Sequence, residues 1–220
     1  MATIAVFGAN GTIGRRVVRE ALDRGHAVTA VVRDPELYRG SVEPHDRLTV
    51  ETGDVLDPAS VSAVGRDADV LVSAVGGGDG PGHAALIEPS AQSLVAGLHA
   101  LGGRAPRLIM VGGAGSLRTP GGALVWDTPG LPDQVLQIMH AHGDALAYLR
   151  GITSELNWTY FSPAGTIEPG VRTGEYRTGL DDLITGADGD SRISAEDYAA
   201  ALVDEIERPA HLNKRFTVGY

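Results

Sequence analysis

Short apolar runs alternate with segments of helical periodicity along the whole chain. The first run, at residues 3–7, is β-rich, and apolar side chains then recur at helical spacing at Val17, Val18, Ala21 and Leu22. Further strand-like runs follow at residues 26–32, 48–51, 69–75, 107–111 and 156–163. A helical stripe begins at Pro89, and Ser194 with Asp197 marks the start of a last long helix. This alternation predicts an α/β fold, with a doubly wound, mostly parallel sheet and helices on both faces.

The composition adds limits to this picture. A chain of 220 residues, 43% of them hydrophobic and without a linker segment, predicts one domain over 1–220, with substrate loops near 112–133 and 164–190. The net charge of -10, without a cluster of cations, argues against a nucleic-acid partner. The absence of cysteine excludes a disulfide framework and thiolate chemistry. No segment resembles a membrane span or a signal peptide, so we expect a cytoplasmic protein without a membrane partner; the oligomeric state stays open.

A glycine-rich turn joins the first apolar run to the first helix. Its fixed points are Gly8, Gly11 and Gly14. Gly8 allows the tight turn, Gly11 lets phosphates approach the backbone, and Gly14 lets the helix pack on the strand. The free N–H groups and the helix dipole at such a turn favour a bound pyrophosphate. Because the motif lies between a strand and a helix, it predicts a dinucleotide-binding site rather than a plain glycine turn. We expect no metal ion in this site.

The end of the second strand-like run is where such a fold meets the adenosine ribose. Arg33 holds this place, and Asp34 follows one step later. An arginine suits a 2′-phosphate through charge-assisted hydrogen bonds, whereas an acidic residue suits a free 2′-hydroxyl. Arg33 therefore favours NADP over NAD. The alternative is an ordinary solvated arginine at the end of a strand.

The turn Gly8-Ala-Asn-Gly-Thr-Ile-Gly14 resembles the first turn of the atypical and extended short-chain dehydrogenase/reductases. The edge at residues 156–163, the Arg-Thr-Gly-Glu-Tyr segment at 172–176 and the segments at 191–198 and 215–220 resemble one subgroup of them. This is the NmrA-like or biliverdin-IXβ and flavin-reductase-like subgroup, often described as candidate NADH-flavin reductases. The resemblance covers essentially the whole chain. It implies a Rossmann fold and NADP (NADPH) as the cofactor.

The resemblance also implies which residues meet the cofactor. In chain order these are Asn10, Thr12 and Ile13 along the phosphates, Asp54 and Val55 at the adenine, Ala74, Val75, Gly76, Gly77 and Gly78 beneath the ribose and phosphates, and the backbone after Pro163 at the nicotinamide. From the residues alone, Asp57 or Ser60 equally reads as the N-cap of a helix. Residues 76–84 are glycine-rich and are expected to be mobile.

The chain has no Tyr-x-x-x-Lys pair, because its only lysine is Lys214 and no tyrosine precedes it by four positions. Two other residues are candidates for catalysis. Ser116, after the run at 107–111, is the nearest candidate for the family serine that binds a substrate carbonyl. His142 lies on an apolar helical stripe, about where the family lysine lies. The alternatives are a loop serine bonded to its own backbone and a satisfied core histidine.

Hydride transfer needs no protein nucleophile, since the cofactor carries the chemistry. An enzyme without the Tyr/Lys pair can still reduce an acceptor that takes its proton from solvent. We therefore expect an NADPH-dependent reductase of a conjugated small molecule, flavin- or quinone-like, in a pocket walled by Trp126, Glu168 and Arg172. Trp126 could equally be a core plug. The other hypotheses are a non-catalytic NADP-sensing regulatory protein and an epimerase or dehydratase, which needs a strong base that the sequence does not offer.

Overall fold

The structure, a computed structural model, describes residues 1–76, 81–152 and 156–220. In these residues eight strands form one sheet, in the order β3 (Leu48–Thr52), β2 (Ala27–Val32), β1 (Thr3–Phe7), β4 (Val70–Ser73), β5 (Arg107–Val111), β6 (Trp158–Ser162), β10 (Lys214–Gly219) and β8 (Arg177–Gly179). All neighbours pair in parallel except β8, which runs antiparallel to β10. A second, two-stranded parallel sheet consists of β7 (Thr166–Glu168) and β9 (Arg192–Ser194). The prediction of a doubly wound, mostly parallel α/β fold is confirmed.

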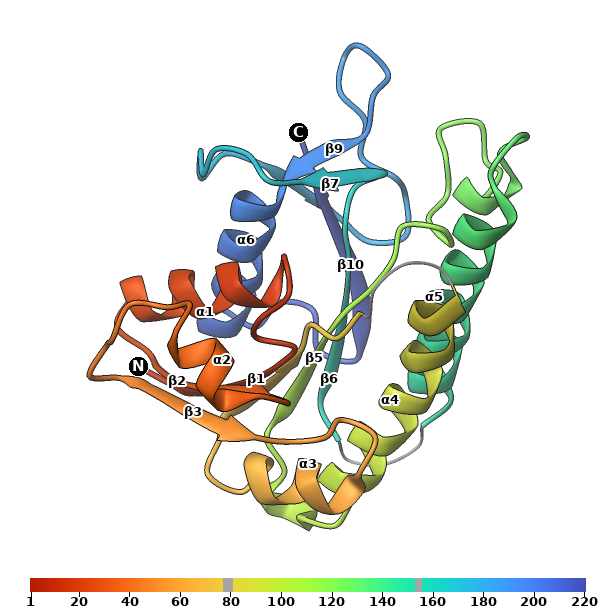
Figure 1. The fold of residues 1–220 in the computed structure, drawn as a ribbon. Helices are drawn as coiled ribbons and strands as arrows, with labels where there is room; N and C mark the ends of the chain where they lie inside the picture. Colours follow the sequence, from red (N-terminus) through yellow and green to blue (C-terminus); the bar gives the residue numbers. More distant parts are fainter. Residues whose placement is uncertain (77–80, 153–155) are drawn as a thin grey trace.

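Two layers of helices cover the two faces of the large sheet (Figure 1). The helices are α1 (Gly14–Asp23), α2 (Pro35–Arg39), α3 (Pro58–Gly65), α4 (Pro81–His99), α5 (Asp133–Gly151) and α6 (Ala195–Glu207), with the 3-10 turns η1 (Gly102–Arg104) and η2 (Val125–Asp127). α1 and α6 pack on one face, and α3, α4 and α5 cover the other. The central strands are thus buried on both faces, which accounts for their unbroken apolar runs.

Aromatic rings consolidate the core on the side of α6. The ring of Phe161 on β6 stacks against those of Tyr198 and Phe216, with centroid distances of 4.0 Å in both pairs. The Tyr198 hydroxyl donates to the Phe161 carbonyl oxygen at 2.5 Å, so its polar end is satisfied inside the core. Fully burying a side chain of this size contributes about 1.5–3 kcal/mol. The stack fixes α6 to the strand that ends at the candidate site.

The structure corrects the sequence prediction in two places. The helix expected from Pro89 begins at Pro81, and Pro89 lies inside it. Proline is common in the first turn of a helix, so Pro89 is easily taken for a start, although the buried Ile87 continues the apolar stripe before it. Of the glycine-rich stretch 76–84, residues 77–80 lie outside the described residues, and with them the expectation for Gly77 and Gly78. Residues 81–84 are helical rather than a loop.

Candidate cofactor site

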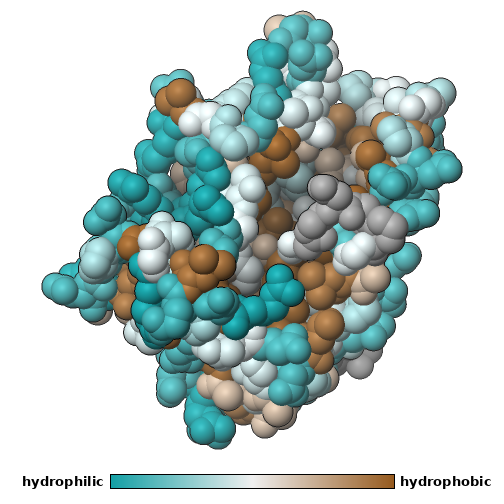
Figure 2. All heavy atoms as spheres, viewed as in Figure 1, coloured by the Kyte–Doolittle hydropathy of each residue, from teal (hydrophilic) through white to brown (hydrophobic). Residues whose placement is uncertain are grey.

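The candidate site lies between the carboxyl ends of β1 and β4. The chain continues from β1 towards one edge of the sheet and from β4 towards the other, so a crevice opens where the two directions separate. Gly8 follows β1 with a φ of +76°, and a Cβ there would lie 2.6 Å from the carbonyl oxygen of Ala74, just after β4. Figure 2 shows this face hollowed near its middle, with hydrophobic atoms in the depression.

The three glycines of the turn differ in how strictly the fold requires glycine at their positions. A Cβ at Gly14 would collide with the Gly8 carbonyl group and come within 2.9 Å of the Ala9 Cα atom. A Cβ at Gly11 would meet only the Gly8 carbonyl oxygen at 3.3 Å and the Ala74 carbonyl oxygen at 3.9 Å. The protein itself therefore requires glycine at positions 8 and 14, and much less at position 11. Gly11 is exposed, so the space above it is open to a ligand.

The N-terminus of α1 offers free hydrogen-bond donors beside this turn. Its N-cap, Ile13, provides no side-chain cap, and the first turn holds no acidic residue. Among the described residues, the backbone N–H groups of Thr12 and Ile13 donate to no acceptor in the protein. Arg15 folds over the turn and donates to the carbonyl oxygens of Gly11 at 3.2 Å and Asn10 at 2.7 Å. Free N–H groups, a helix dipole and a guanidinium together fit a pyrophosphate.

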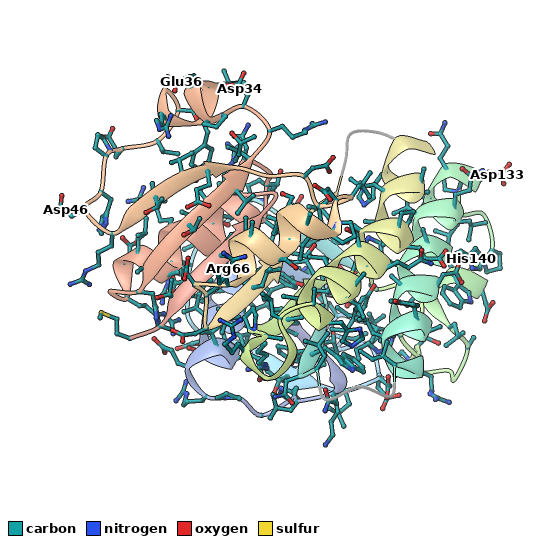
Figure 3. All side chains as sticks on the ribbon, turned by 90° about the horizontal axis from the view of Figure 1, so that it is seen from below. Asp34, Glu36, Asp46, Arg66, Asp133 and His140 are labelled. Carbon is teal, nitrogen blue, oxygen red and sulfur yellow. The ribbon has the colours of Figure 1, made fainter. Side chains whose placement is uncertain are left out.

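The adenosine end of the crevice presents a free cation. Arg33 follows β2 directly and is exposed, and within the described part of the chain it has no hydrogen bond or ion pair. Asp34 is already used by the fold, since its carboxylate caps α2 by accepting from the Leu37 N–H at 3.0 Å. Figure 3 shows Asp34 and Glu36 projecting from α2 at the surface. The charge beside this strand end that is available to a ligand is therefore that of Arg33.

The remaining cofactor residues line the same edge of the sheet. Asp54 is exposed, and its carboxylate accepts from the Leu56 N–H at 2.9 Å. Val55 is buried beside it. The alternative reading of this segment also holds, because Asp57 caps α3 by accepting from the Ala59 N–H. Ala74, Val75 and Gly76 follow β4, with Gly76 exposed, and the buried Pro163 follows β6. Their cofactor contacts stay predictions.

His142 is buried on α5, as expected of a residue on the apolar stripe. The hydroxyl of Tyr160 donates to the His142 carbonyl oxygen at 2.7 Å and lies 3.2 Å from its Nδ1. Because that hydroxyl donates its only proton to the carbonyl oxygen, Nδ1–H is the donor in the contact between the His142 ring and the Tyr160 oxygen. The ring of His83 meets that of His142 edge-on, with centroids 5.6 Å apart. Burial, and secondarily His83, lowers the pKa of His142 to about 3, so the imidazole is neutral.

Ser116 is joined to β10 rather than to His142. Its hydroxyl accepts from Arg215 Nη1 at 2.7 Å, and its carbonyl oxygen accepts from Nη2 at 3.1 Å. Asp181 holds the same guanidinium through its Nε at 2.8 Å. The structure therefore does not place the two catalytic candidates in contact. Their roles in catalysis stay predictions.

The three candidate substrate residues lie in three different places. The ring of Trp126 lies against that of His140 of α5 in a tilted arrangement, with centroids 4.7 Å apart and an interplanar angle of 34°. Glu168 lines a groove of about 470 Å³ along β7 and β9. Arg172 forms a two-fold contact with Glu20 of α1, at 2.7 Å and 2.6 Å. The expected common pocket wall of these three residues is thus not formed, because Arg172 is used to fasten its loop to α1.

Several contacts at the site have no signal in the sequence. Arg16 donates to Glu196 at 2.6 Å and to the Thr12 carbonyl oxygen at 2.7 Å, and Glu196 accepts from the Gly170 N–H at 2.7 Å. This chain of contacts connects the glycine turn to the loop after β7. Arg16 and Glu196 are 180 positions apart, so no local pattern reveals the pair. Tyr160 gives no signal either, because all five residues of β6 are buried and no alternation distinguishes one face of the strand.

Comparison with known proteins supports a fold that binds a nicotinamide cofactor. The model of a family described as NAD(P)H-binding matches residues 8–209. A solved structure of a candidate exported protein from Burkholderia pseudomallei is similar over 100% of both chains, with 41% identity and a TM-score of 0.85. A candidate epimerase from Bacteroides thetaiotaomicron shares 38% identity over 99% of this chain and 96% of its own, with a TM-score of 0.87. A candidate NADH-flavin reductase from Streptococcus pneumoniae shares 31% identity over 100% and 99%, with a TM-score of 0.82.

The described residues contain neither a candidate membrane span nor a candidate metal site. No helix there has the length and apolar character needed to cross a membrane. No group of three or more histidine and acidic side chains is arranged there to hold a metal ion. Neither result fixes the location of the protein in the cell, and the expectation of a cytoplasmic protein stays a prediction.

Proposed function

Since this chain belongs to the NAD(P)H-binding family, we propose that it is an NADPH-dependent oxidoreductase that transfers a hydride to a conjugated small molecule, flavin- or quinone-like. The observation that carries the proposal is the β1–β4 crevice, where the N–H groups of Thr12 and Ile13 donate to no acceptor among the described residues and Gly11 is exposed. The similarity to the candidate NADH-flavin reductase supports the reaction type.

The residues of this chain bind and orient the cofactor. The turn at Gly8–Gly14 and Arg15 hold the pyrophosphate, Arg33 holds the 2′-phosphate, and Asp54 with Val55 borders the adenine. The bound NADPH supplies the hydride, as in other nicotinamide enzymes. The contacts from Arg16 through Glu196 to Gly170 keep the loop after β7 in register with the glycine turn. That loop follows Pro163 and closes the nicotinamide end against water.

The state of His142 limits the chemistry of the acceptor. An imidazole whose pKa is lowered to about 3 is not an imidazolium acid at ordinary pH, and its remaining N–H, at Nδ1, is directed to Tyr160. His142 therefore acts as a positioning residue rather than an acid. The acceptor must take its proton from solvent after it receives the hydride. Flavins and quinones can do so because their reduced anions are delocalised, which simple carbonyl compounds cannot match.

Steady-state oxidation of NADPH with free flavin, followed by the loss of NADPH absorbance, tests this function. Wild type is expected to turn over, and Gly11→Val to lose activity because a branched side chain fills the space of the phosphates. Gly103→Val is the matched control, since a Cβ there meets nothing within 4 Å. NADPH binding without turnover of flavins or quinones would contradict the proposed reductase function and support the hypothesis of an NADP-sensing protein.

An epimerase is the second candidate, because the Bacteroides thetaiotaomicron protein of similar fold is described as one. An epimerase returns its cofactor to the starting redox state, so it would show no net NADPH oxidation with any acceptor. It would also need a strong base. His142 in its buried, neutral state and Ser116 in its contact with Arg215 are poor bases, which favours the reductase.

A further inference from the structure

A second pocket lies on the flank of α5, on the side of that helix turned away from α4. It is lined by α5, the loop that contains η2, and residues of β10 and of the loop after β8, and it shares no residue with the β1–β4 crevice. Its volume is about 620 Å³, within the roughly 300–1,000 Å³ that is common for small-molecule sites. The pocket is therefore large enough for a ligand of its own.

An aromatic side chain, Trp126, lines this pocket. Trp126 lies along α5 because position 143 is glycine: a Cβ there would be 2.7 Å from the indole ring. The ring of His140 supports Trp126 from outside, and Figure 3 shows His140 at the outer surface of α5. Leu124 and Leu146 extend the apolar lining. A flat apolar wall of this kind suits a planar ring, which stacks in an offset manner.

Another part of the lining is cationic. Arg118, Arg150 and Arg215 line the pocket together with a single acidic residue, Asp181. The side chain of Arg215 is only 4% exposed, and Asp181 is shared between Arg215 and Arg150, to which it lies at 2.8 Å. One carboxylate thus serves two guanidinium groups. Arg118 is paired in turn with Asp182 at 3.5 Å. Three guanidinium groups against these two carboxylates leave one net positive charge at the pocket, in a chain with a net charge of -10, and this local field attracts an anion.

Ser116 adds a polar anchor to the same wall. Its hydroxyl and carbonyl groups hold Arg215 in place. Arg150 is about half exposed and contacts Asp181 through Nη2, so its other N–H groups can donate to a ligand. A guanidinium binds a carboxylate through two parallel charge-assisted hydrogen bonds. We propose that this pocket binds a small planar aromatic carboxylate, with its ring on Trp126 and its carboxylate at Arg150. The proposal does not rest on hydride transfer in the cofactor crevice.

Calorimetric titration with benzoate tests the proposal, with the neutral isostere benzamide and with acetate as the paired probes. Benzoate should bind at least about tenfold more tightly than either, because one lacks the charge and the other the ring. Arg150→Ala, whose side chain is half-exposed, should weaken benzoate about tenfold. Arg66→Ala is the matched control, since Arg66 is an exposed arginine at the end of α3 and lines neither pocket (Figure 3).

Nuclear magnetic resonance locates the bound ring. The chain has two tryptophans, so its spectrum holds two indole N–H signals, which Trp126→Phe assigns. Benzoate should shift the signal of Trp126 and leave that of Trp158, which is buried in the core, in place. The proposal is overturned if wild type shows neither heat nor shift, if benzamide binds as well as benzoate, or if Arg150→Ala and Arg66→Ala bind benzoate alike. NADPH affinity should be the same in both variants, so this result is independent of the proposed reaction.

Discussion

Replacing Gly14 by alanine places a methyl group against the backbone of the turn that this glycine closes. The new Cβ would collide with the Gly8 carbonyl group and lie 2.9 Å from the Ala9 Cα atom. The turn cannot move aside easily, because Gly8 itself lies close to the Ala74 carbonyl group just after β4. Inserting a methyl group into such a packed place costs about 1–3 kcal/mol. Alanine regains at most about 1 kcal/mol through its higher helix propensity.

The same change at Gly11 meets one carbonyl oxygen at 3.3 Å and otherwise open space. Its effect on the free energy of unfolding should stay within about 0.5 kcal/mol, as at most surface positions. Cofactor affinity should nevertheless fall, because the methyl group enters the space proposed for the pyrophosphate. We therefore expect Gly14→Ala to lower stability clearly, and Gly11→Ala to lower NADPH affinity in a protein of nearly normal stability.

Urea unfolding at equilibrium measures the first effect, and titration with NADPH measures the second. Gly103→Ala is the control for both, since a Cβ at Gly103 has no neighbour within 4 Å. Equal unfolding midpoints for Gly14→Ala and wild type would show that the turn yields more easily than its packing indicates. Unchanged NADPH affinity in Gly11→Ala and Gly11→Val would remove the glycine turn from the cofactor site.

Three further predictions follow from single side chains. Arg33→Ala should weaken NADPH binding about ten- to a hundredfold and leave NADH binding unchanged in titrations with both cofactors. Replacement of the exposed Arg19 by alanine is the control, and an equal cofactor preference in wild type and Arg33→Ala would exclude Arg33 from the site. Arg172→Ala should lower the free energy of unfolding by about 0.5–1 kcal/mol at pH 7, because its partner Glu20 has a lowered pKa that Arg172 chiefly maintains, although half of the Arg172 side chain is exposed to solvent. A lowered carboxyl pKa stabilises the folded state above the ordinary value of 4.5 and loses this effect as the pH falls, so unfolding of both proteins across that range should show the difference shrinking; a difference independent of pH would argue against the ion pair. His142→Gln should leave the shape of the turnover profile unchanged between pH 5 and 9, because burial lowers the pKa of His142 to about 3; loss of an inflection near pH 6.5 in the variant would show that His142 titrates in the working range.

The sequence determined the order of the elements and the place of the phosphate turn. Strand-like runs and helical stripes are local properties, so the parallel sheet, the capping of α6 by Ser194 and the burial of His142 could all be predicted from them. The need for glycine at positions 8 and 14 could be predicted from the motif, since no other residue fits the turn. The short segments α2, β7, β8 and β9 could not be predicted, because three to five residues hold too little periodicity to distinguish them from loops.

Only the tertiary structure decided which side chains meet across the fold. Ser116 follows β5 as a substrate-binding serine would, yet Arg215, 99 positions away, takes its hydroxyl. Arg172 lies in a loop expected to border the substrate, but it pairs instead with the buried carboxylate of Glu20 on α1. Charged and polar groups of buried strands and helices must find partners wherever the sheet brings them, because an unpaired buried charge is costly. Those pairings depend on strand order rather than on neighbours in the chain, and they fix the pocket beside α5 that no sequence motif marks.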